Sequence, residues 1–320
     1  MIEQVLVLSV VVAFALVNGV NDGGTLVSLG LRTALSRTWL RLAVLVAALG
    51  LTPVVLEPRV AITLGERLVS FEGDVGRLAV LAAVLATLGV VWLLTARGWP
   101  TSLTLALVGA LAGAGLAAGL PVGWGAVGVV LVIAAVAPAL GVVGAMILHR
   151  LVTPLLGAVP GFRRALPSVG HALQSLAYGA NDGQKMLAVL AAVMGTSARF
   201  PEAPAGLWAV VVVAFALGSI VGIARIGPTI DGKVLPLRTE QVALAQLSGG
   251  GAVLGSAVLA GPVSLIQAVS GGLVGAGVSV TPRRVRWAAV GQIVLAWLVT
   301  LPAAFVAGGL LMAGLNVVWP

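Results

Sequence analysis

The dipeptide Asn-Asp occurs twice inside strongly apolar sequence, at Asn21-Asp22 and at Asn181-Asp182, half the length of the 320-residue chain apart. A glycine stands two residues before each copy, at Gly19 and Gly179. A carboxylate is costly to bury in membrane-length apolar sequence, and membrane proteins keep one there mainly for function. The duplicated pair therefore predicts a site for ions or polar solutes within a membrane.

A second landmark repeats at nearly the same spacing. Pro100-Thr101-Ser102 precedes a run of glycine and alanine at 109–115, and Pro262-Val263-Ser264 precedes a similar run at 271–277. The two landmarks agree on one internal duplication of the chain. Duplicated membrane halves with glycine-interrupted apolar segments are typical of secondary transporters.

Composition excludes an ordinary soluble domain, because 60% of the residues are hydrophobic, only 9% are charged and the mean hydropathy is +1.14. The formal net charge of +8 does not indicate nucleic-acid binding, since the basic residues are scattered among short loops, where they set membrane orientation. The sequence has no cysteine, metal-ligand cluster or catalytic-triad spacing. We therefore expect a multi-pass protein of the plasma or inner membrane that is not an enzyme.

Hydropathy predicts an all-α fold of about ten membrane elements, about five in each half. The apolar stretches are 4–31, 39–56, 78–96, 101–120, 124–148, 169–196, 207–224, 240–260, 262–280 and 287–317. We place the first membrane repeat at 1–148, a central linker at 149–168 and the second repeat at 169–320. The first and sixth stretches carry the Asn-Asp pairs and predict interrupted helices. The fourth and ninth begin near proline and serine and predict re-entrant hairpins, and we favour an inverted relation between the repeats.

The polar residues of these elements suggest complementary roles. Asp22 and Asp182 are candidate ligands for a hard cation, together with backbone carbonyls that a helix break would free. Hydroxyls on the hairpins could cradle an oxyanion; they belong to Thr101, Ser102, Thr104 and Ser264. Lys185 lies three residues after Asp182, and the sequence leaves open whether it binds an anion or neutralises Asp182.

At these residues the chain resembles the inorganic phosphate transporter (PiT) family of sodium- or proton-coupled symporters. That family repeats a Gly-Ala-Asn-Asp signature, which is similar to Gly19-Val20-Asn21-Asp22 and to the run from Gly179 to Lys185. The resemblance spans nearly the whole chain. It implies two inverted repeats with hairpins that meet near the membrane centre, often in a homodimer. It also implies a cation site at Asn21, Asp22, Asn181 and Asp182, and an anion site that includes Gln184 and Lys185 beside the hairpin hydroxyls.

The hairpin tips depart from the family pattern of Ser-Thr-Thr-His. They read Ser102-Leu103-Thr104-Leu105 and Ser264-Leu265-Ile266-Gln267, so the second tip lacks both threonines. Tyr178 also stands where a histidine usually precedes the second signature, and Thr25 replaces an asparagine after the first. These departures keep two alternatives open: a symporter of another oxyanion such as sulfate, and a transport-dead homologue that acts as a sensor or accessory protein.

The leading interpretation is a symporter that couples inorganic phosphate to sodium or protons by alternating access around a midplane site. Two carboxylates in a low-dielectric cavity repel an approaching phosphate until cations or protons neutralise them. The expected partners are therefore inorganic phosphate, the coupling ion and membrane lipid. No cofactor and no nucleic acid are expected.

Overall fold

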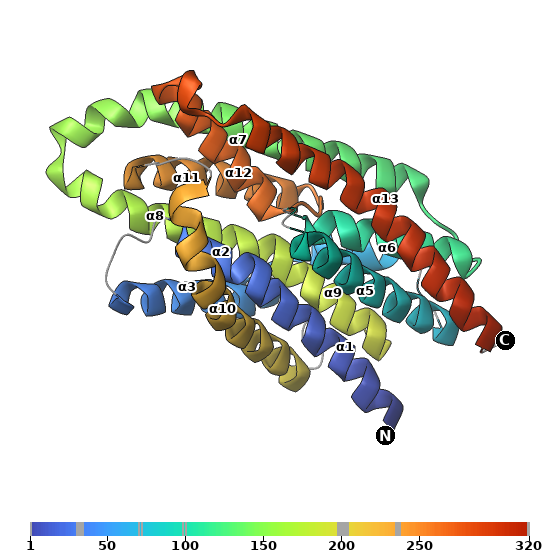
Figure 1. The fold of residues 1–320 in the computed structure, drawn as a ribbon. Coiled ribbons are helices and arrows are strands. Elements are labelled where there is room, and N and C mark those ends of the chain that lie inside the picture. The colour runs from blue at the N-terminus through green and yellow to red at the C-terminus, as the bar shows by residue number, and fades with distance from the viewer. Residues whose placement is uncertain are drawn as a thin grey trace.

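The computed structural model describes residues 2–29, 35–69, 71, 73–97, 99, 101–196, 205–233 and 238–318. The described residues are almost entirely helical, and their only β pairing is an isolated bridge between Val69 and Val122 (Figure 1). This confirms the predicted all-α fold.

Six helices among the described residues are long and apolar enough to cross a membrane. They are α1 with its continuation through η1 and α2 (Ile2–Asn18, Gly19–Gly23, Gly24–Ser28), α3 (Leu35–Val55), α5 (Gly73–Ala96), α7 (Trp124–Ala158), α10 (Ala205–Lys233) and α13 (Trp287–Val318). Large apolar side chains such as Val132, Leu298 and Leu310 are exposed along α7 and α13, as expected of surfaces that face lipid.

The remaining elements include the two shorter apolar helices that follow the Pro-x-Ser landmarks, α6 (Leu103–Ala117) and α12 (Leu265–Val280). The others are α4 (Arg59–Ile62), η2 (Thr63–Arg67), α8 (Pro160–Tyr178), η3 (Gly179–Gly183), α9 (Gln184–Met194), α11 (Thr239–Val258) and η4 (Pro282–Arg284). The predicted linker at 149–168 consists of the end of α7 and the start of α8, which meet at the extended residue Val159. The boundaries of the two repeats at 148 and 169 stay a prediction.

Corresponding elements of the two halves each pack on an element of the opposite half. The turn η1 packs on α10 of the second half while η3 packs on α3 of the first, and α6 packs on α13 while α12 packs on α7. Figure 1 shows α1 running opposite to α8–α9, and α7 running opposite to α13. Opposite directions of corresponding helices are the signature of an inverted repeat, as predicted.

Glycines allow these interlocked helices to touch backbone to backbone. A Cβ atom on Gly218 of α10 would lie 2.1 Å from the Leu16 carbonyl oxygen, beside the first Asn-Asp turn. A Cβ on Gly271 of α12 would lie 2.1 Å from the Pro138 carbonyl oxygen of α7. Helices in lipid associate through such close packing of small residues, because no hydrophobic effect drives them together. The glycine runs therefore hold the two halves together.

Gly271→Ala should destabilise the protein by about 1–3 kcal/mol, because the new methyl group cannot fit without moving α12 away from α7. The matched control is Gly251→Ala on α11, where an added Cβ would meet nothing within 4 Å. Thermal unfolding of the two detergent-solubilised variants checks the prediction. Equal melting temperatures would show that α12 can move away from α7 without loss of stability.

Candidate functional site

Each Asn-Asp pair lies in a π-helical turn inserted in an otherwise α-helical segment. The first turn is η1 (Gly19–Gly23) and the second is η3 (Gly179–Gly183). Such turns are the predicted interruptions of the α-helices, and π-turns occur frequently at functional sites. The backbone nevertheless stays helical, and Gly24 N–H donates to the Gly19 carbonyl. The interruptions are thus π-helical turns rather than open breaks of the helix.

The second turn holds the second hairpin through Asn181. Its Nδ2 donates to the Gly261 carbonyl at 2.9 Å, and its Oδ1 accepts from Val263 N–H at 3.1 Å. Asn181 is fully buried, so both bonds are shielded from water. The tip of the second hairpin, which leads into α12, is thereby fixed directly to the signature turn.

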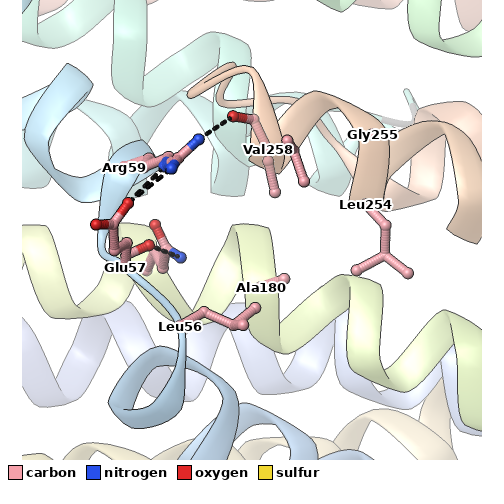
Figure 2. A pocket seen from close by; sticks show the side chains of 9 residues that line it. Leu56, Glu57, Arg59, Ala180, Leu254, Gly255 and Val258 are labelled. Atoms are coloured by element: carbon pink, nitrogen blue, oxygen red, sulfur yellow. Dashed lines mark hydrogen bonds and ion pairs between the residues drawn. The ribbon is translucent and has the colours of Figure 1, made fainter.

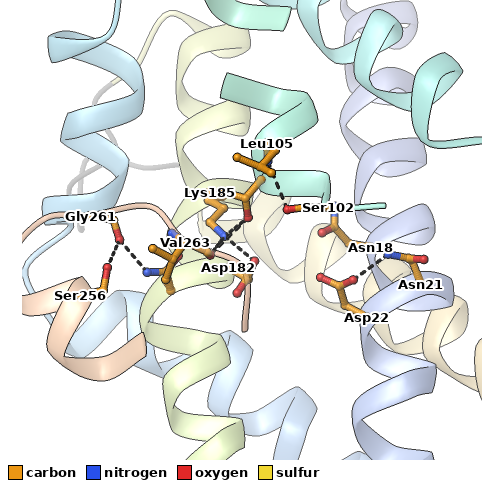
Figure 3. Close-up of polar contacts among 12 residues, drawn as sticks. Asn18, Asn21, Asp22, Ser102, Leu105, Asp182, Lys185, Ser256, Gly261 and Val263 are labelled. Carbon is orange, nitrogen blue, oxygen red and sulfur yellow. Dashed lines mark hydrogen bonds and ion pairs between the residues drawn. The ribbon is translucent and has the colours of Figure 1, made fainter. Parts of the chain in front are cut away.

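Lys185 joins the second turn to both hairpins (Figure 3). Its ammonium donates to Asp182 Oδ1 at 2.6 Å, to Thr104 Oγ1 at 2.6 Å and to the Val263 carbonyl. Thr104 Oγ1 in turn donates to the same Val263 carbonyl at 3.2 Å. These contacts confirm the prediction that the two hairpin tips meet, and they place the meeting point beside the second Asn-Asp turn.

The first turn is arranged differently from the second. Asn21 Nδ2 donates at 2.8 Å to Asp22 Oδ1, its own neighbour, and holds no hairpin in the described structure. Thr25, at the position that matches Lys185, donates from Oγ1 to the Asn21 carbonyl at 2.6 Å. Asp22 is 4% exposed and forms no ion pair among the described residues. The two halves are thus electrostatically unequal.

The hydroxyls of the hairpins are buried around this centre. Ser102 begins α6 and its Oγ accepts from Leu105 N–H at 3.3 Å, whereas Ser264 begins α12 without such a capping bond. Thr101 Oγ1 is buried and has no hydrogen-bond partner in the described structure. Figure 3 shows Ser102 on the side of the centre that faces Asp22. The first tip therefore offers the hydroxyls of Thr101 and Ser102, whereas Thr104 is occupied by Lys185 and Val263.

Asp182 Oδ2 is likewise buried without a hydrogen-bond partner in the described structure. Tyr178 lies close to Asp22 and Asp182 and packs on Phe215 at a centroid distance of 5.4 Å. Buried polar groups are nearly always hydrogen-bonded, so the free Asp182 oxygen beside the hairpin hydroxyls makes this centre a candidate for binding a ligand. Sequence reasoning did not assign Tyr178 to the site, although its position directly before the second signature was the available signal.

Gln184 is the predicted site residue that the structure separates from the others. Its Oε1 accepts from Val60 N–H at 2.8 Å and its Nε2 donates to the Glu57 carbonyl at 3.1 Å. It thus positions the connection between α3 and α4, and borders a cavity of about 530 Å³ (Figure 2). Ala180 of the second signature, Glu57 and Arg59 also line this cavity, which therefore reaches the signature turn.

Similarity to known proteins agrees with this arrangement. The sequence profile of the phosphate transporter family matches the chain twice, at residues 18–171 and 157–308. A probable low-affinity inorganic phosphate transporter of Mycobacterium tuberculosis (strain ATCC 25618 / H37Rv) is 34% identical over 318 residues, covering 92% of this chain and 73% of the relative. One of Bacillus subtilis (strain 168) is 27% identical over 337 residues, covering 100% of this chain and 99% of the relative.

A solved structure shares the fold. The sodium-dependent phosphate transporter superimposes with a TM-score of 0.84 at 18% identity, and the match covers 99% of this chain and 100% of that one. Each of the two matches to the family profile includes one Asn-Asp signature. The chain is therefore a multi-pass membrane protein, not an enzyme, and it belongs to the phosphate transporter family.

Proposed function

We propose that this protein carries inorganic phosphate across the membrane together with sodium or protons, by alternating access around the centre formed by the two turns and the two hairpins. The observation that carries the proposal is the pair of buried carboxylates, Asp22 and Asp182, beside the hydroxyls of the hairpin tips. Relatives named as phosphate transporters support phosphate as the substrate. The sodium dependence named for the solved relative supports coupling to a cation.

Electrostatics explains why coupling follows from this site. A carboxylate about 4 Å from a phosphate charge opposes binding by about 4 kcal/mol at an effective dielectric constant of about 20. Asp182 forms an ion pair with Lys185, whereas Asp22 forms none among the described residues and is influenced by the Lys185 charge only from a greater distance. A sodium ion or a proton at Asp22 removes the repulsion. Phosphate then binds only after the cation, which prevents either from leaking alone.

The candidate residues divide into two groups in this proposal. On the cation side are Asn21, Asp22, Asn181 and Asp182. On the anion side are the hydroxyls of Thr101, Ser102 and Ser264, with Thr104, Gln184 and Lys185 acting indirectly. Gln184 shapes the cavity through which phosphate approaches, and Lys185 keeps Asp182 from repelling it.

The free oxygen of Asp182 favours phosphate over sulfate. Asp182 Oδ1 accepts from Lys185, while Oδ2 is a buried acceptor without a partner in the described structure. Phosphate retains a proton near neutral pH and can donate to this oxygen, whereas sulfate has none to offer. An unsatisfied buried acceptor costs about 1–3 kcal/mol, which amounts to about tenfold or more in affinity.

Uptake of labelled phosphate into proteoliposomes tests the function, with sodium and proton gradients imposed separately. We expect one of the two gradients to drive accumulation, and excess sulfate to compete at least about tenfold less well than unlabelled phosphate. Accumulation of sulfate instead of phosphate would support the alternative oxyanion symporter. Purified, folded protein that accumulates neither anion under either gradient would contradict the proposal and favour a sensor or accessory role.

A further inference from the structure

The Lys185 ammonium has the surroundings of a bound metal cation. Its three partners are a carboxylate oxygen of Asp182, a hydroxyl oxygen of Thr104 and the carbonyl oxygen of Val263. They come from three segments that are distant in the sequence: the second signature and the two hairpins. Hard cations are held in proteins by such mixed sets of carboxylate, hydroxyl and carbonyl oxygens.

This ammonium is fully occupied. A lysine has three N–H donors, and the three contacts use all of them. The side chains of Lys185 and Asp182 are 5% and 3% exposed, so neither charge is solvated by water. In this conformation Lys185 has no donor left for an anion, and its charge repels any second cation from Asp182.

The first half contains the same signature without this arrangement. Thr25 occupies the position that matches Lys185, and its hydroxyl donates to the Asn21 carbonyl. Asp22 is as buried as Asp182, yet no lysine or arginine among the described residues pairs with it. A buried carboxylate requires a counter-charge or a proton. Within the described structure only the charge of Lys185, which is paired with Asp182, acts on Asp22, so a partner in direct contact with Asp22 has to come from solution.

From this contrast we infer that the Lys185 ammonium permanently replaces the coupling cation at the second signature. The exchangeable cation then binds only beside Asp22, and each phosphate is accompanied by one cation fewer than two equivalent signatures would bind. The inference rests on the proposed function for its meaning in transport. The occupancy of Asp182 is nevertheless a statement about cation binding that can be tested without phosphate.

The test is Lys185→Thr, which gives the second signature the residue of the first. Binding of radioactive sodium to the purified full-length protein is measured at saturation, without phosphate. We expect the variant to bind one more sodium ion per chain than the wild type, whether or not the wild type itself binds sodium. Equal numbers for the folded variant and the wild type would overturn the inference.

A second measurement, of melting temperature, applies even if the Lys185→Thr variant is poorly stable. If sodium replaces the lost ammonium, sodium should raise the melting temperature of Lys185→Thr more than that of the wild type, relative to choline at equal ionic strength. The matched control is the double variant Asp182→Asn/Lys185→Met, which removes both charges together. It should show the wild-type sodium response. The same sodium response in all three proteins would also overturn the inference.

The outcomes separate this inference from the proposed function. An extra sodium ion in Lys185→Thr supports the inference even if the wild type fails to accumulate phosphate, which would contradict the proposed function alone. Conversely, cation-driven phosphate uptake by the wild type with an unchanged sodium number in Lys185→Thr contradicts the inference alone.

Discussion

Asp22→Asn should abolish cation-coupled phosphate uptake while leaving the yield and melting temperature of the protein close to those of the wild type. Asparagine keeps the size and the hydrogen-bond acceptor that Asn21 uses, but it carries no charge to attract a cation. Because Asp22 forms no ion pair in the described structure and Lys185 keeps its pairing with Asp182, neutralising Asp22 leaves no buried charge without a direct partner. The measurement is the initial rate of labelled phosphate uptake into proteoliposomes.

Asp182→Asn should also abolish uptake, and it should destabilise the protein as well. The substitution leaves the Lys185 ammonium buried without its counter-charge, which costs about 3–5 kcal/mol for a buried pair. The control for both variants is Asp74→Asn, since the Asp74 side chain is 95% exposed and lies outside the site. Wild-type uptake rates in Asp22→Asn or in Asp182→Asn would contradict the assignment of the signatures.

The second large effect concerns the hairpin tips. Thr101→Val and Ser102→Ala should each weaken phosphate binding about tenfold or more, because a hydrogen bond to a charged group contributes about 1.5–3 kcal/mol. Ser264→Ala should weaken it less, since the second tip has lost its threonines and its backbone is already held by Asn181. Phosphate titrations at saturating cation give the affinities.

A matched control removes a hydroxyl from α12 far from its tip. Ser279 Oγ donates to the Gly275 carbonyl within the helix, so Ser279→Ala should leave phosphate affinity unchanged. Equal losses for the Thr101, Ser102 and Ser264 variants would show that the two tips contribute alike. The prediction that the first tip contributes more to phosphate binding than the second would then be wrong.

Much of the fold could be predicted from the sequence because a membrane limits the structures that a buried chain can adopt. The repeated Asn-Asp pairs and Pro-x-Ser runs predicted two inverted repeats whose hairpins meet, and the Thr104–Val263 contact confirms that the tips meet. The π-helical form of the turns could not be predicted, since glycine-rich sequence suits both a break and a helix. Tertiary packing decides: a Cβ on Gly19 would lie 2.2 Å from the Phe215 carbonyl oxygen, so η1 stays a close-packed helix against α10.

The chemistry of the site was less accessible from the sequence. The spacing of three residues predicted that Lys185 could reach Asp182, but its contacts with Thr104 and Val263 depend on how the hairpins fold back. Gln184 belongs to the same motif as Lys185, but consecutive side chains of a helix point about 100° apart. The Gln184 side chain therefore reaches the α3–α4 connection and not the hairpins. Sequence spacing therefore could not show which neighbours belong to the site.

The coupling role of Asp22 is tested most directly by phosphate binding to the purified protein with and without the coupling cation, compared between the wild type and Asp22→Asn. We expect the cation to strengthen phosphate binding to the wild type by about a hundredfold or more, the equivalent of removing several kcal/mol of repulsion. In Asp22→Asn the repulsion is already absent, so phosphate should bind equally well with and without the cation. Cation dependence that persists undiminished in Asp22→Asn would contradict the claim that Asp22 couples the cation to phosphate.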